Sequence, residues 1–150
     1  MVQYKTIVLT TDLSPNANAA QPYAVELARK YDGIIFLIHV FEQDIYYASS
    51  SSGEGLAANP VEWLVEFRKQ RAEQLEKAAK ALQQQGVRVI HKMCEGHPAH
   101  EVIALAKKEK ADCIVISTHG RSGISQLVFG SVAERVVRLS PCPVLTVRPS

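Results

Sequence analysis

An unbroken apolar run, Ile34 to Ile38, is the feature of this sequence that most restricts its fold. A strand with one wet face alternates between apolar and polar residues, whereas a continuous apolar run is typical of a strand buried on both faces. Strands of that kind occur mainly in parallel sheets that helices cover on both sides. The run therefore predicts a parallel sheet enclosed by helices.

Strand patterns and helix patterns alternate along the rest of the chain. Helical spacing of apolar residues fills the intervals between predicted strands, and one helix is expected from Pro60 to about Gln85, where Gly86 ends it. The strands are predicted at 4–11, 33–40, 87–93, 113–117 and 144–147. A βαβαβαβαβ order implies an α/β fold, with a five-stranded, mostly parallel sheet and helices on both faces. Partial alternation in 87–93 favours a place near a sheet edge.

Two segments leave alternatives open within a single domain of 150 residues. Pro22 interrupts the helical pattern that begins at Pro15, so that helix either kinks or begins later. The segment 42–58 contains four consecutive serines and has no periodicity. It is predicted to be a flexible loop, either a lid or a plain linker.

Small and hydroxyl residues follow the fourth predicted strand. The stretch begins Ser117, Thr118, His119, Gly120, continues Arg121, Ser122, Gly123, and reaches Gly130, Ser131, Val132 where a helix begins. Backbone N–H groups freed by glycine, next to the positive end of a helix, favour an anion. Each glycine alone is more typical of a turn, and Arg121 is either a phosphate partner or a surface residue. Together they predict a phosphate site.

A second strand end carries similar chemistry. Thr10, Thr11 and Asp12 close the first predicted strand. Ligands of parallel sheets bind outside the carboxyl ends of the strands, where strand order reverses. Asp12 is therefore favoured as a ligand residue, with a structural role in a turn as the alternative. The Walker-type and Rossmann glycine motifs are absent from the sequence.

Charge and composition exclude several classes of function. The net charge of +2 is small and the basic residues are dispersed, so no nucleic-acid partner is expected. The sequence has no apolar run long enough to cross a bilayer and no basic-then-apolar leader, so no membrane association is expected. Three widely spaced cysteines fit a reduced, cytoplasmic protein better than a disulfide framework or a zinc site.

The glycine spacing resembles that of the universal stress protein family, and the similarity covers almost the whole chain. Gly120, nine residues, then Gly130-Ser131 reproduce the pattern of the nucleotide-binding members, Gly-x2-Gly-x9-Gly-Ser/Thr, except its first glycine. That position is Ser117, whose Cβ and hydroxyl either clash with a ligand or add a hydrogen bond. The Gly96-x-Pro98 turn is similar too. The resemblance implies a Rossmann-like fold of the adenine nucleotide alpha hydrolase type.

The same resemblance implies where a nucleotide lies. Asp12 and the backbone of Val40 would contact adenosine, and Thr10 and Ser117 would lie near the ribose. The triphosphate would extend across Gly120 to Gly123 and Gly130-Ser131. The implied ligand is ATP or another adenine nucleotide, with Mg²⁺ bound by the phosphates rather than by a protein cage.

We therefore expect an ATP-binding regulatory protein of the stress response, which acts through conformation or partner binding. No general base is evident, so hydrolysis is expected to be slow or absent. A homodimeric interaction module without nucleotide, and a slow ATPase or autophosphorylating protein, are the alternatives. The short apolar strand Val144–Val147 suggests a sheet edge, and the resemblance implies antiparallel pairing of two copies there. The possibility of a further, unknown protein partner is left open.

Overall fold

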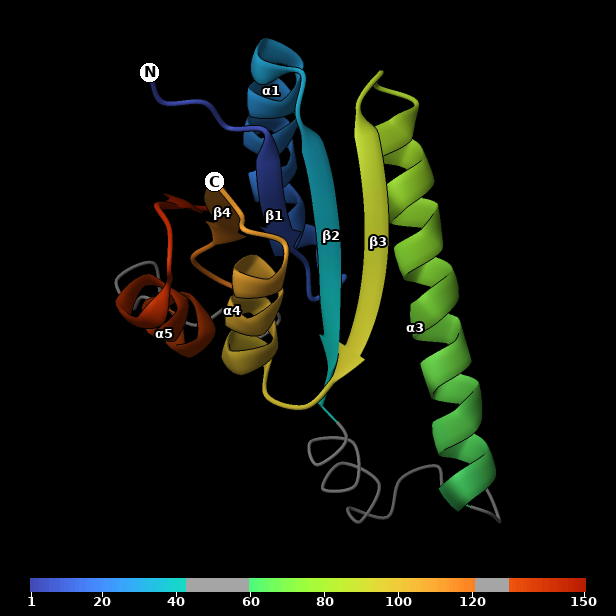
Figure 1. The fold of residues 1–150 in the computed structure, drawn as a ribbon. Helices are drawn as coiled ribbons and strands as arrows, with labels where there is room; N and C mark the ends of the chain where they lie inside the picture. The colour runs from blue at the N-terminus through green and yellow to red at the C-terminus, as the bar shows by residue number, and fades with distance from the viewer. Residues whose placement is uncertain (43–59, 121–129) are drawn as a thin grey trace.

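One parallel sheet of five strands organises the protein. The computed structural model describes residues 1–42, 60–120 and 130–150 (Figure 1). The strands are β1 (Thr6–Thr10), β2 (Ile34–Phe41), β3 (Arg88–Glu95), β4 (Cys113–Ser117) and β5 (Val144–Val147). Their order is β3-β2-β1-β4-β5, and every pair is parallel. The predicted fold class is confirmed, and β3 and β5 are the edge strands.

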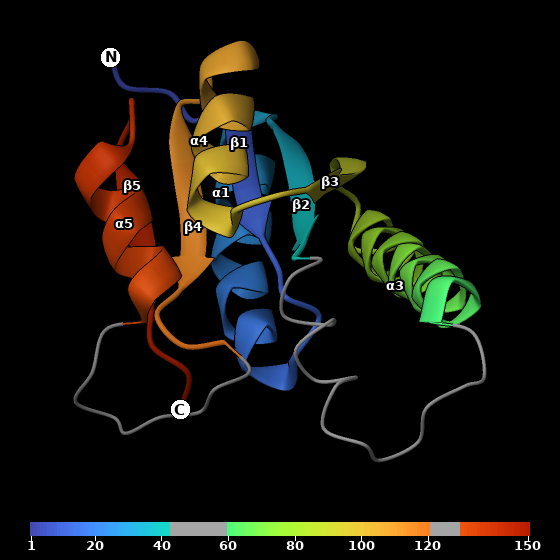
Figure 2. The same cartoon turned by 90° about the horizontal axis from the view of Figure 1, so that it is seen from below.

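Helices cover both faces of this sheet. Figure 2 shows α1 (Gln21–Tyr31) and α3 (Pro60–Gln83) on one side, with α4 (Pro98–Lys108) and α5 (Ser131–Leu139) on the other. Successive side chains of a strand point to opposite faces. Ile7 and Leu9 of β1 accordingly pack in the core beneath α1 and α3, whereas Val8 packs beneath α4 and α5. Both faces of the central strands are therefore buried, as the apolar runs predict.

The first helical segment differs in part from the prediction. Pro15–Ala20 is a 3₁₀ helix, η1, and the α-helix begins only at Gln21. Pro22 lies in the first turn of α1, where its missing N–H has no intrahelical partner to lose. The later start is thus the correct alternative. Ser14 caps η1, because its side chain accepts a hydrogen bond from the Ala17 N–H.

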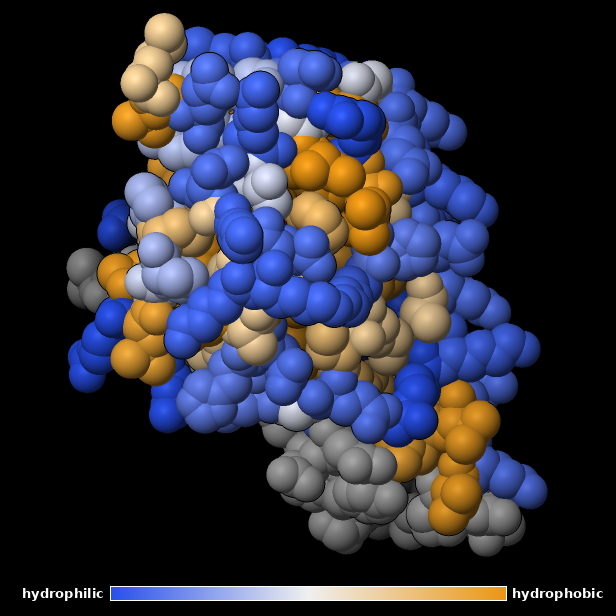
Figure 3. Space-filling view, in the orientation of Figure 1, coloured by the Kyte–Doolittle hydropathy of each residue, from blue (hydrophilic) through white to orange (hydrophobic). Residues whose placement is uncertain are grey.

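The long helix α3 is amphipathic along the sheet and then extends past the end of β3 (Figure 1). Its later turns bury Leu75, Ala79 and Leu82. Near its first turns Val61 and Val65 are exposed, and Figure 3 shows apolar side chains at that end of the helix. No helix within the described ranges is long and apolar enough to span a bilayer.

Two sequence predictions concern positions outside the described ranges. The predicted flexible loop at 42–58 lies there apart from Glu42. Arg121, Ser122 and Gly123 of the predicted phosphate site lie there as well.

Candidate functional site

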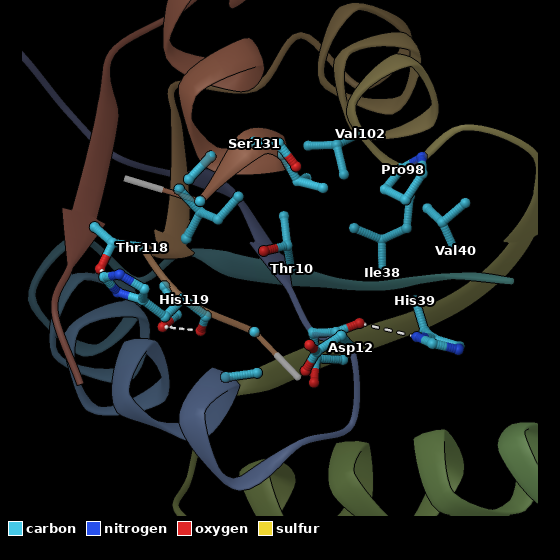
Figure 4. Close-up of a pocket in the computed structure, with 18 of the residues that line it drawn as sticks. Thr10, Asp12, Ile38, His39, Val40, Pro98, Val102, Thr118, His119 and Ser131 are labelled. Atoms are coloured by element: carbon cyan, nitrogen blue, oxygen red, sulfur yellow. Dashed lines mark hydrogen bonds between the residues drawn. The ribbon is translucent and has the colours of Figure 1, made fainter. Parts of the chain in front are cut away.

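The strand order reverses between β1 and β4, which lie side by side. Their carboxyl ends carry Thr10–Asp12 and Ser117–Gly120, so the two stretches singled out in the sequence meet at one place. A pocket of about 430 Å³ opens between them (Figure 4). A cavity at this position in a doubly wound sheet is where ligands bind.

Ten of the predicted site residues line this pocket, and the other three are those outside the described ranges. The ten are Thr10, Thr11, Asp12, Val40, Ser117, Thr118, Gly120, Gly130, Ser131 and Val132. They come from the ends of three strands and the start of one helix, far apart in the sequence. The fold therefore brings together every described residue of the predicted set.

Asp12 shapes the turn that leaves β1. Its Oδ1 accepts hydrogen bonds from the Ser14 N–H, at 2.9 Å, and from the Ser14 hydroxyl. The Thr11 hydroxyl oxygen accepts the Leu13 N–H at 3.0 Å. Leu13 has a φ of 65°, which is uncommon for a residue with a branched side chain. Asp12 therefore stabilises this turn. Its carboxylate also lines the pocket, so the structural role does not exclude a ligand role.

The two described loop glycines are required for space rather than for unusual backbone angles, since neither has a positive φ. A Cβ on Gly120 would overlap Oδ2 of Asp12, and a Cβ on Gly130 would overlap the Thr118 carbonyl oxygen. The Gly130 N–H also donates to that carbonyl at 2.8 Å. The glycines thus allow the loop backbone to lie close to the β1 turn and to itself.

Ser117 makes hydrogen bonds rather than a clash. Its hydroxyl lies 3.0 Å from the Asn16 carbonyl oxygen and 2.9 Å from that of His119. In turn, the Asn16 side-chain amide donates to the Gly120 carbonyl at 3.1 Å. Asn16 was not identified from the sequence, because nothing local shows that η1 contacts a loop about a hundred residues later.

Further lining residues come from η1, β2, β4, α4, α5 and the segments that follow β2 and β4. They are Ala17, Ile38, His39, Glu42, Pro98, Val102, Ile116, His119 and Ala133. Figure 4 shows Ile38, Val40, Pro98 and Val102 together at one end of the pocket, away from Thr118 and His119. The Gly96-x-Pro98 turn was the available signal for this wall. Its aliphatic side chains form a surface suited to a flat, weakly polar ring.

The two histidines at the pocket are held by neighbouring oxygens. His39 is buried, and its Nδ1 lies 2.9 Å from the Thr11 carbonyl, so that nitrogen carries the proton. Nδ1 of His119 lies 2.9 Å from the Thr118 hydroxyl. Nε2 of His119 is buried and has no hydrogen-bond partner in the described part of the chain. The contact with Thr118 gives His119 a structural role at the start of the loop.

The charge around the pocket is uneven. Among the described lining residues Asp12 and Glu42 are acidic, and none is Lys or Arg. The opposite wall is the start of α5, whose N-cap is Gly130 and whose first turn has no side-chain cap among the described residues. Its first N–H groups therefore supply a local positive potential at Ser131 and Val132. This wall is suited to an anion.

Metal ligands do not gather in the described ranges. No group of three or more His, Cys, Asp or Glu side chains there could hold a metal ion. His97 and His100 have ring centroids 4.9 Å apart and are both exposed. Two exposed imidazoles are fewer than the four ligands of a structural zinc site.

The fold and pocket define a class: a doubly wound α/β protein with a pocket at its topological switch point. The sequence model of the universal stress protein family matches residues 3–148. The chain therefore belongs to the universal stress protein family. The resemblance seen in its glycine spacing is confirmed.

Individual relatives agree with this assignment. Universal stress protein MJ0531 of Methanocaldococcus jannaschii is 34% identical over 146 residues, which are 97% of this chain and 82% of the relative. Universal stress protein YxiE of Bacillus subtilis is 30% identical, covering 97% of this chain and 99% of the relative. The solved structure of MJ0577 aligns with a TM-score of 0.83 at 25% identity over 99% of both chains.

Two solved members of the family carry ligands. One is a complex with cAMP, with a TM-score of 0.69 and 23% identity over 99% of each chain. The other, from Archaeoglobus fulgidus, is a complex with dAMP, with a TM-score of 0.65 and 21% identity over 98% of this chain and 99% of that chain. At this identity the likeness shows a common fold.

Proposed function

We propose that this protein binds ATP or another adenine nucleotide in the pocket between β1 and β4. One observation carries the proposal: the N-terminus of α5, which no described side chain caps, and an aliphatic wall open into the same 430 Å³ pocket. A nucleotide has an anionic end and a flat base, and these two surfaces complement both. The complexes of relatives with cAMP and dAMP support an adenine nucleotide.

The charge distribution supports one orientation of the proposed nucleotide. The phosphates lie across Gly120 and the start of α5, where backbone N–H groups are available to them. Of these two places, the start of α5 lies opposite the acidic wall, whereas Gly120 lies beside the Asp12 carboxylate. The base lies against the aliphatic wall near Val40, with the adenosine within reach of Asp12. With ATP, Mg²⁺ binds the phosphates and brings its own charge to a pocket that lacks a described basic residue.

The proposed output is regulatory. Nucleotide occupancy would change conformation or partner binding during a stress response, with slow or no hydrolysis. The three free thiols fit a reducing compartment, and we place the protein in the cytoplasm. Phosphate release from wild type that disappears in a Gly130→Asp variant would instead favour a slow ATPase.

Nucleotide binding is tested on the purified protein. We expect adenine nucleotide in the supernatant after denaturation, and a rise in melting temperature on adding Mg-ATP, because a ligand of the native state stabilises it. Absence of both would contradict the proposal and favour the nucleotide-free interaction module.

A matched pair of variants tests the phosphate position. Ser131→Asp places a carboxylate at the first residue of α5, where it favours the helix and repels a phosphate. Ser131→Asn has nearly the same shape without the charge. We expect a loss of affinity of at least about tenfold for the aspartate variant alone, with no fall in its unliganded melting temperature. Equal affinity in both variants would place the phosphates elsewhere.

We also propose a homodimer formed by antiparallel pairing of β5. In the described sheet β5 pairs only with β4, and Leu145 on it is 36% exposed. Leu145→Glu should give a folded monomer in light scattering coupled to size exclusion, because a charge at a strand pairing edge opposes association. Ile90→Glu on β3, the other edge strand, is the control and should leave the dimer intact. An unchanged dimer in Leu145→Glu would contradict this interface.

A further inference from the structure

Two hydrogen bonds connect η1 with the end of β4 and the loop that follows it, and a third lies within that loop segment. We call Asn16, Ser117 and Gly120, with these bonds, the Asn16 clasp. The single proton of the Ser117 hydroxyl is shared between the carbonyl oxygens of Asn16 and His119, and the Asn16 side-chain amide donates to the Gly120 carbonyl. The clasp therefore joins the two strand-end segments that form the pocket.

The clasp acts on backbone groups and thereby orients the loop. The C=O of His119 and the N–H of Gly120 belong to one planar peptide unit and point in opposite directions. A hydroxyl that fixes the His119 carbonyl thus fixes the direction of the Gly120 N–H. Backbone N–H groups of this loop are the groups proposed to receive phosphate, so their direction decides whether the loop is ready for a ligand.

The other end of the clasp is itself held by local contacts. Asn16 lies in η1, whose start is fixed by Pro15 and by the Ser14 cap. Ser14 in turn donates to the Asp12 carboxylate. Asp12 touches Gly120 across the pocket wall. A closed ring of contacts therefore runs from the β1 turn through η1 to the glycine loop and back.

We infer that Asn16 and Ser117 are positioning residues for the nucleotide. They hold the β1 turn and the glycine loop in the arrangement that accepts phosphate before any ligand arrives. A glycine at position 117 would have no hydroxyl to bridge the two carbonyls, so serine makes this arrangement available. The inference rests on the proposed function, since it concerns affinity for the same ligand.

The test compares two asparagines of the same 3₁₀ helix. Asn16→Ala removes the bond to Gly120, whereas Asn18→Ala removes only an exposed contact with Gln21. Titration calorimetry with Mg-ATP should show affinity reduced about five- to tenfold in Asn16→Ala, the size of one neutral hydrogen bond, and unchanged within about twofold in Asn18→Ala. Unliganded melting temperatures are measured for both.

Variants of Ser117 provide a second, independent test. Ser117→Ala removes the hydroxyl and should weaken binding like Asn16→Ala, whereas Ser117→Thr keeps the hydroxyl and should retain most of the affinity. The carboxylate of Asn16→Asp cannot donate to the Gly120 carbonyl, so this variant should not recover the affinity for Mg-ATP. A residue that only stabilises the fold would lower the melting temperature and leave the affinity of the folded protein unchanged.

The outcomes separate the inference from the proposed function. If wild type binds Mg-ATP and Asn16→Ala binds as tightly as Asn18→Ala, the positioning role is wrong and the nucleotide site stands. If wild type binds neither Mg-ATP nor AMP, the proposed function fails and the inference fails with it.

Discussion

Gly120 lies against the Asp12 carboxylate so closely that a single Cβ on the glycine would overlap Oδ2. The contact joins the end of β1 to the loop after β4. It explains why a glycine is needed at a position whose φ is not positive. The Asp12 side chain cannot easily retreat, because Ser14 holds its other oxygen through two hydrogen bonds.

Gly120→Ala should therefore destabilise the protein by about 1–3 kcal/mol, the usual cost of overpacking. In an Asp12→Ala background the overlap is gone, and the same substitution should cost much less. Urea unfolding of the wild type, the two single variants and the double variant gives the coupling free energy between the two positions. Equal costs in both backgrounds would show that the two residues do not compete for space.

Gly130→Ala should be more damaging to the pocket, since its Cβ meets the backbone carbonyl of Thr118 rather than a side chain. The Thr118 N–H is bound to the Val147 carbonyl at 2.8 Å, so this segment cannot shift freely. We expect a loss of about 2 kcal/mol in unfolding free energy together with loss of nucleotide-induced stabilisation. Gly86→Ala, at an open position of positive φ far from the pocket, is the control. It should cost about 1 kcal/mol and leave ligand stabilisation intact.

The burial of Cys113 should make the stability of the protein fall at alkaline pH. Burial raises the pKa of its thiol from 9.0 to about 11. Between these values the unfolded thiol has lost its proton and the folded one has kept it, so stability falls as pH rises. The fall should be on the order of 2 kcal/mol from pH 9 to 11. Cys113→Ala lacks this contribution, and its unfolding free energy should fall less over the same range.

Lys110 offers a stabilising substitution at the end of α4. It is exposed with a φ of 51°, while the Ala111 N–H reaches back to the Ala106 carbonyl at 2.8 Å. Glycine has no penalty in this conformation, so Lys110→Gly should raise the unfolding free energy by about 0.5–1 kcal/mol. Lys107→Gly, inside the same helix, should lower it by about 1 kcal/mol. A loss in both variants would contradict the conformational explanation.

The sequence was sufficient for the sheet and for most of the pocket. Strands 113–117 and 144–147 were predicted to the residue, because β-branched runs bounded by polar or proline residues leave little choice. Once β and α segments alternate, all carboxyl strand ends share one sheet edge. That rule places Asp12 and Gly120 at the same edge, and the pairing of β1 with β4 then brings them together.

Other features depend on distances that no local pattern contains. Whether Ser117 clashes or bonds depends on where the Asn16 carbonyl lies, which only the packing of η1 on the loop decides. The 3₁₀ form of Pro15–Ala20 was missed, because a few apolar residues do not separate i+3 from i+4 bonding. Trp63 and Phe67 have the helical spacing of core residues, yet they stack on each other and are only partly buried.

The pairing of β1 with β4 also governs when the pocket can exist during synthesis. Ile7 pairs with Cys113, and α5 follows later still. A chain still on the ribosome after β3 has the β1 turn but lacks the strand, the glycine loop and the helix end that complete the pocket. If the protein binds nucleotide as proposed, a chain at that stage lacks the groups that would hold it.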